Sequence, residues 1–142
     1  MAEELSQWVT FTLDSEVYGI NVMQIQEVLR YTEIAPVPGS AHYILGIINL
    51  RGNVVTVVDG RKKLSLPDTE DIKSSRIIII EVENQVLGLL ADSVAEVIEI
   101  QDQSIEVNTT DEYDPQKYIH GVCQVDANLL ILIDVKRLFS QE

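Results

Sequence analysis

The sequence predicts an all-β protein made of two small five-stranded β-barrels that pack about a shared core, with a few short helices. Roughly ten short apolar segments, most of them grouped into four hairpins, recur along the chain. They do not alternate with long helices, as the strands of parallel α/β folds do. Strands in this number do not close neatly into one small barrel, whereas two barrels accommodate all of them and leave no exposed strand edges.

An alternation of apolar and other residues near the start of the chain predicts the first hairpin. Val9, Phe11 and Leu13 stand at every second position, which is the period typical of a strand. A polar turn at residues 14–16 then leads to a returning strand at residues 17–20.

Residues 22–29 are predicted to form a short amphipathic helix. Asn21, followed three residues later by Gln24, resembles a capping box at a helix N-terminus. Apolar residues of the segment share one helical face: Val22, Ile25, Val28 and Leu29. Met23 lies on another face beside the charged Glu27, where water or a partner is expected.

A central hairpin follows at residues 44–58. Its two strands are rich in β-branched residues, and Gly52 between them supplies the positive φ that a short hairpin turn needs. Arg51 stands at the apex of the turn. A guanidinium held there is a directional hydrogen-bond donor suited to a partner's carboxylate or backbone carbonyls. The alternative interpretation is that Arg51 is a solvated turn arginine that binds no partner.

Another apolar hairpin is predicted at residues 76–82 and 86–90, across a turn at residues 83–85. Residues 94–100 continue as an interrupted strand. No internal sequence repeat is strong enough to demonstrate a duplication.

The last part of the chain is predicted to contain one more hairpin and a helix. Residues 101–117 are polar and irregular, with one helical turn at their start. Residues 118–125 and 129–133 then pair as strands, and Asp134 caps a short helix that ends at Phe139.

Charge disfavours a nucleic-acid or polyphosphate partner. The 10 basic and 23 acidic residues give a formal net charge of −13, which repels such polymers. Four of the basic residues cluster: Arg51, Arg61, Lys62 and Lys63. Residues 96–114 are acidic without a Lys or Arg. This asymmetry suits head-to-tail docking onto a partner with complementary patches, although a solvated acidic face is the simpler interpretation.

No catalytic, cofactor-binding or metal site is predicted. His42 and His120 are far apart, no His, Cys and Asp cluster has metal spacing, and the glycines form no phosphate-binding or dinucleotide motif. Cys123 is the only cysteine, which fits a reducing cytoplasm. The polar first residues and the short apolar runs predict neither export nor membrane insertion. A binding module is therefore favoured over an enzyme.

Several motifs, in order and centred on Asn49-Leu50-Arg51-Gly52, resemble the CheW family of bacterial chemotaxis coupling proteins over nearly the whole chain. They are Phe11-Thr12-Leu13, Tyr18-Gly19-Ile20, Gln26-Glu27-Val28, Gly46 to Gly52, Val57-Val58-Asp59, Val86-Leu87-Gly88-Leu89 and Leu130 to Ile133. The resemblance implies one CheW-like domain over residues 1–142, made of two intertwined β-barrel subdomains. It also implies a protein without catalytic activity or cofactors.

A family member bridges the cytoplasmic tip of a methyl-accepting chemoreceptor and the regulatory domain of the histidine kinase CheA. The resemblance therefore implies a cytoplasmic adaptor that is monomeric in isolation, because its net charge opposes self-association, and that joins ring arrays when the kinase is present. The absence of phosphotransfer, ATP-binding and receiver segments distinguishes the chain from CheA and from the related CheV.

Seven residues are implied to lie near the receptor groove between the barrels: Arg51, Ile25, Glu27, Val28, Val86, Leu87 and Gly88. Helical periodicity instead assigns Ile25 and Val28 to a buried face, so the two interpretations conflict there. Gly60 replaces the leucine that the family has after Val58-Asp59, which predicts a weakened short helix at that point.

Two alternatives remain open from the sequence. The same fold could serve another signalling array, such as one for pilus control or surface sensing. An unrelated all-β ligand-binding protein or enzyme is the other. The sequence names neither the receptor nor the array.

Overall fold

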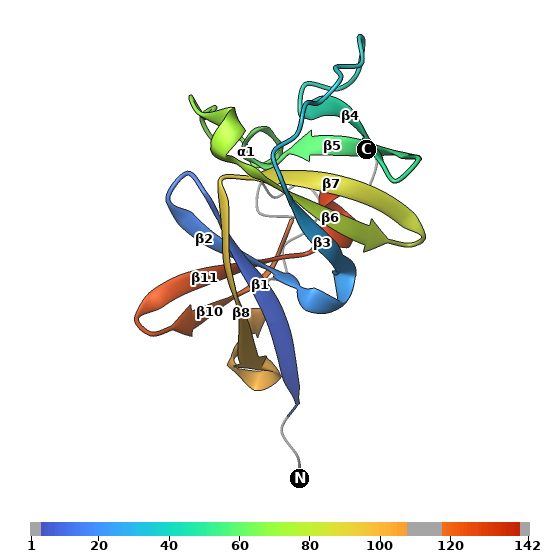
Figure 1. The fold of residues 1–142 in the computed structure, drawn as a ribbon. Helices are drawn as coiled ribbons and strands as arrows, with labels where there is room; N and C mark the ends of the chain where they lie inside the picture. The colour runs from blue at the N-terminus through green and yellow to red at the C-terminus, as the bar shows by residue number, and fades with distance from the viewer. Residues whose placement is uncertain (1–3, 108–117, 140–142) are drawn as a thin grey trace.

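The computed structural model describes residues 4–107 and 118–139 and confirms the predicted all-β fold (Figure 1). In this part of the chain, eleven strands form one six-stranded and one five-stranded sheet. The other elements are short: α1 (Gly60–Lys63), α2 (Val135–Leu138) and the 3₁₀ turns η1 (Val22–Gln24), η2 (Ile72–Ser74) and η3 (Asp102–Ser104).

The six-stranded sheet has the order β8-β1-β2-β11-β10-β9. Its strands are β1 (Leu5–Leu13), β2 (Glu16–Asn21), β8 (Ser93–Gln101), β9 (Glu106–Val107), β10 (Ile119–Val125) and β11 (Asn128–Ile133). All neighbours are antiparallel except β2 and β11. The expected interrupted strand at residues 94–100 is one strand, β8, whose pairing with β1 shifts register between Val9 and Phe11.

The five-stranded sheet has the order β3-β6-β7-β5-β4. Its strands are β3 (Ile25–Arg30), β4 (Ile44–Leu50), β5 (Asn53–Asp59), β6 (Arg76–Val82) and β7 (Gln85–Ala91). Here β5 and β7 are the parallel pair. This sheet corresponds, strand by strand, to β8-β1-β2-β11-β10 of the other sheet.

Each sheet curls until its first edge approaches its last. In the five-stranded sheet, Ala35 lies just beyond β3 and exchanges two backbone hydrogen bonds with Ile47 of β4, at 2.9 and 2.8 Å. The close approach requires Gly46, because a Cβ at this position would lie 2.1 Å from the Ala35 carbonyl oxygen. In the six-stranded sheet β9 pairs with β10, and a Cβ at Gly121 would lie 2.5 Å from the Glu106 carbonyl oxygen.

The two halves of the chain have the same fold. Each contains a hairpin, a third strand, a second hairpin and a short helix, and the helix is α1 in the first half and α2 in the second. The Asp59 backbone N–H donates to the Tyr43 carbonyl at 2.8 Å in the first half. The Asp134 N–H donates to the Tyr118 carbonyl at the same distance in the second. The structure therefore reveals an internal structural duplication that is not visible in the sequence.

Each sheet combines strands from both halves. The five-stranded sheet takes β3, β4 and β5 from the first half and β6 and β7 from the second. The six-stranded sheet takes β1 and β2 from the first half and its other strands from the second. In Figure 1, β3 leaves the hairpin β1–β2 and lies beside β6 of the other sheet.

Buried apolar side chains form three clusters. One lies inside each curled sheet, and the third, which includes Phe11, Ile20, Leu89 and Leu138, takes residues from both sheets. The run of residues 77–80 is apolar throughout because alternate side chains of β6 enter the cluster of the five-stranded sheet and the shared cluster. The shared apolar core that the resemblance implied is thus present.

The predicted helix at residues 22–29 is wrong. Only η1 is helical, and Asn21 caps it by accepting a hydrogen bond from the Met23 N–H at 2.9 Å. The chain then continues as β3, which pairs with β6 and shifts register between Ile25 and Glu27. Pairing along β6 satisfies the backbone of this segment and outweighs the helical spacing of its apolar residues.

The last hairpin and its helix are confirmed, with Asp134 accepting a hydrogen bond from the Arg137 N–H at 3.2 Å. The helical turn expected at the start of residues 101–117 is η3, and residues 108–117 of that prediction lie outside the described residues. The short helix expected after Val58-Asp59 is present as α1, and Gly60 is its first residue.

Candidate functional site

The turn between β4 and β5 projects Arg51 from the five-stranded sheet. Arg51 and Gly52 have φ values of 52° and 87°, the two positive values that a tight two-residue hairpin turn uses. The Asn49 side chain accepts a hydrogen bond from the Gly52 N–H at 3.0 Å and supports the turn. As a result, the Arg51 side chain is 66% exposed on a firmly held backbone.

Arg51 is not a free turn arginine, because its Nη2 donates to Oε2 of Glu27. Glu27 belongs to β3, whereas Arg51 follows β4, so the ion pair joins opposite edges of the curled sheet. Since the arginine is largely exposed, such a pair contributes at most about 1 kcal/mol to folding. It holds the guanidinium in place while leaving most of it open to a partner.

A cavity of about 380 Å³ lies beside this ion pair, and we call it the hairpin pocket. Arg51 and Gln26 line it together with the apolar Val54 and Val86. Val54 is 67% exposed, so its side chain is open to a partner. The pocket thus combines an oriented cation with apolar surface.

A second cavity, of about 390 Å³, lies where α2 of the second half meets the five-stranded sheet, and we call it the inter-barrel pocket. It is lined by Tyr43, Lys63 and Leu87 from one side and by Leu138 and Phe139 from the other. Val54 and Val86 line both pockets, which makes them neighbours along one surface.

The structure brings four of the seven predicted residues together around these pockets. Arg51 lines the hairpin pocket and is paired with Glu27, Val86 lines both pockets, and Leu87 lines the inter-barrel pocket.

The other three predicted residues differ in their exposure. Val28 of β3 is 39% exposed, as the resemblance implied and contrary to the helical periodicity. Ile25 is partly buried and packs against the shared core. Gly88 is buried in the sheet, where a Cβ would lie 3.0 Å from Ile77 Cγ2. This residue therefore offers no contact surface to a partner.

The residues that the prediction missed include Val54, Tyr43 and Lys63 of the inter-barrel pocket. Val54 continues an apolar strand in the sequence and therefore does not stand out as exposed. Lys63 was grouped with the charged surface, yet the structure leaves it only 9% exposed.

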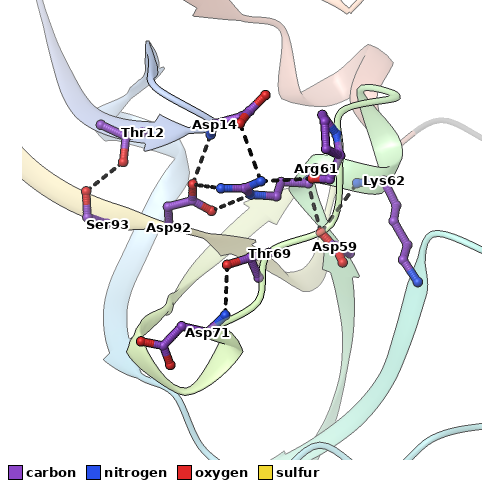
Figure 2. Close-up of polar contacts among 10 residues, drawn as sticks. Thr12, Asp14, Asp59, Arg61, Lys62, Thr69, Asp71, Asp92 and Ser93 are labelled. Carbon is purple, nitrogen blue, oxygen red and sulfur yellow. Dashed lines mark hydrogen bonds and ion pairs between the residues drawn. The ribbon is translucent and has the colours of Figure 1, made fainter.

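Polar contacts hold α1, the element that carries Lys63, in place (Figure 2). The Asp59 carboxylate accepts from the Arg61 and Lys62 N–H groups at 3.0 and 3.4 Å and caps the helix. Arg61 donates from Nε and Nη2 to both carboxylate oxygens of Asp92 and lies 3.6 Å from Asp14 Oδ1. This network places Arg61 inside the fold rather than at the pockets.

The same network shifts two pKa values in opposite directions. Burial raises the pKa of Asp59, and the hydrogen bonds from Lys62 and Arg61 offset that rise only in part. Burial alone would also raise the pKa of Asp92, but the hydrogen bonds and charge of Arg61 outweigh it and hold this pKa below its usual value.

Burial raises the pKa of the Cys123 thiol, which lies in β10 as a free cysteine. Among the described residues, no three His, Cys, Asp or Glu side chains are placed to hold a metal ion. No helix in that part of the chain has the length and hydropathy to cross a bilayer.

Comparison with known proteins gives a consistent result. Residues 7–142 match the family described as CheW-like domain. Chemotaxis protein CheW of Bacillus subtilis is 32% identical over 94% of this chain and 86% of that protein. Chemotaxis protein CheW of Treponema pallidum is 30% identical over 99% of this chain and 85% of that protein. The crystal structure of scaffolding protein TtCheW from Thermoanaerobacter tengcongensis superposes with a TM-score of 0.89 at 33% identity, covering 98% of this chain and 95% of that one.

Proposed function

This chain belongs to the CheW family of non-catalytic chemotaxis scaffold proteins, and on that premise we propose that it couples a methyl-accepting chemoreceptor to the histidine kinase CheA. The cytoplasmic receptor tip binds along the hairpin and inter-barrel pockets, and the regulatory domain of CheA binds elsewhere on the barrels. The protein acts in the cytoplasm as one domain over its whole length.

The observation that carries the proposal is the Arg51–Glu27 ion pair beside exposed apolar side chains. Arg51 provides an oriented guanidinium, whereas Val54, Val86 and Leu87 provide the adjoining apolar surface. Oriented arginines next to apolar side chains are typical of the energetic centre of protein interfaces. The geometry therefore suits an extended protein partner better than a small polar ligand.

The duplicated fold explains how one small protein holds two partners. Because each curled sheet has its own hairpin end, two separate docking faces are available on one rigid unit. Contacts between unlike faces of successive molecules close into rings when the rotation permits it. We expect monomers in isolation, since the net charge of −13 opposes self-association, and rings when the kinase is present.

The test is reconstitution with purified components. The chain should bind a chemoreceptor tip fragment and the CheA regulatory domain simultaneously, and should raise CheA autophosphorylation only when receptor is also present. Arg30→Ala is a suitable control, because this exposed arginine of the same sheet lines neither pocket. Failure to bind either partner, or binding of the two only in competition, would refute the coupling role.

A further inference from the structure

Lys63 is a buried lysine that lines the inter-barrel pocket. It is 9% exposed, and within the described residues its ammonium has neither a hydrogen bond nor an ion pair. Lysines are almost never buried to this extent unless they are paired. Of the described residues that line the inter-barrel pocket, Lys63 is the only charged one.

Two tyrosines partly compensate the ammonium. Lys63 Nζ lies 3.8 Å from the ring centroid of Tyr43 and 5.2 Å from that of Tyr118. Aromatic faces attract a cation, but they do not replace the hydrogen bonds that an ammonium makes in water. The Lys63 ammonium is therefore held in a fixed place, and its N–H groups can still donate hydrogen bonds to a ligand.

The duplication shows that the fold itself does not need a lysine here. Lys63 is the fourth residue of α1, and the fourth residue of α2 is Leu138. Leu138 is 1% exposed and packs into the shared core, so a leucine satisfies the equivalent position. A charge at residue 63 thus has a role other than packing.

We propose that Lys63 binds the carboxylate of an aspartate or glutamate side chain of the partner segment that occupies the inter-barrel pocket. The inference rests on the proposed function, because the partner is the receptor tip. The fold shields most of the Lys63 side chain from bulk water and holds its ammonium in place, so a carboxylate that enters the pocket meets a preorganised charge.

A carboxylate attached to a protein fits this pocket better than a free anion. Its neighbours on the partner can cover the exposed Val54 and the adjoining Leu87, and a small anion cannot. The overall charge of −13 also opposes a free anion that gains no apolar contact. Of the two nearby guanidinium groups, Arg61 is paired with Asp92, and Arg51 lines the hairpin pocket rather than the inter-barrel pocket.

Lys63→Leu is the decisive variant, because it copies the residue at the equivalent position of the other half. Its melting temperature should equal or exceed that of the parent protein. Its affinity for a purified chemoreceptor tip fragment, measured by titration calorimetry, should fall about tenfold to a hundredfold. Lys73→Leu, the same change at an exposed lysine of η2, should leave the affinity unchanged.

Receptor fragments in which each acidic residue is replaced by its amide complete the experiment. One replacement should weaken binding to the parent protein and have no further effect on Lys63→Leu. Equal binding by the parent and Lys63→Leu would overturn this inference alone. No binding of the fragment by the parent protein would overturn the proposed function as well. Thermal stabilisation by sodium acetate, lost in Lys63→Leu, would assign the pocket to a free anion and also overturn the inference.

Discussion

Arg61 and Asp92 form a two-point contact that fastens α1 to the connection between β7 and β8. Arg61 Nε lies 2.9 Å from Asp92 Oδ1, and Nη2 lies 2.5 Å from Oδ2. The Arg61 side chain is only 14% exposed, so the pair is well shielded from water. Asp14, in the turn between β1 and β2 of the other sheet, contacts the same guanidinium. The network therefore connects both barrels through α1 (Figure 2).

Asp92→Asn should destabilise the protein by about 1–3 kcal/mol at neutral pH, because it leaves a shielded guanidinium with a neutral partner. The pKa of Asp92 is lowered in the folded state, so its contribution is complete above the unfolded pKa and is lost as the pH falls through the folded value. Urea unfolding of both proteins should show the difference shrinking below about pH 4. A difference that is independent of pH would contradict this account.

Asp59→Asn should behave in the opposite way. An asparagine oxygen can still cap α1, and no buried charge remains. Because the folded pKa of Asp59 is raised, its contribution is complete below the unfolded pKa and is lost as the pH rises through the folded value. Relative to the parent, the variant should therefore gain stability with rising pH. A large loss at neutral pH would show that the ionised carboxylate is required.

Arg51→Ala should leave folding intact and weaken receptor binding by about 1–3 kcal/mol, the range of an interfacial arginine. The side chain is 66% exposed and reaches no core cluster, so circular dichroism and the melting temperature should change little. Arg30→Ala is the matched control. Unfolding of Arg51→Ala, or equal losses of affinity in both variants, would assign Arg51 a structural or a nonspecific role.

Gly46→Ala should destabilise the protein by about 1–3 kcal/mol or more, because the new methyl group has no space beside the Ala35 carbonyl. Gly52→Asn serves as the control, since nothing lies within 4 Å of a Cβ at Gly52 and asparagine tolerates its φ of 87°. Chemical denaturation of the two variants measures the contrast. Similar stabilities would mean that the edge closure at Ala35 relaxes without cost.

The hairpins could be predicted because their signals are local. The turns at Asp14-Ser15 and Glu83-Asn84 have two successive positive φ values, and polar residues favour that conformation. Apolar alternation then identifies the flanking strands. The resemblance to a known family led to Arg51, Glu27, Val86 and Leu87, which the structure places around two adjoining pockets.

Local signals failed where a distant segment decides the conformation. The apolar spacing of residues 22–29 fits a helix, but pairing with β6 makes residues 25–30 a strand. The pairing with β6 thus outweighs a local helical preference that amounts to less than about 1 kcal/mol per residue.

By itself the sequence determined the all-β class, the turn positions and the exposed charge at Arg51, because each depends on neighbouring residues along the chain. Only the tertiary structure decided the exchange of strands between the halves and the burial of Lys63. From the sequence alone, Lys63 is expected to be a surface lysine. In the folded protein Tyr43, Tyr118 and the other residues of the inter-barrel pocket surround it. Burial depends on which distant segments pack together, and no local pattern of residue types specifies that.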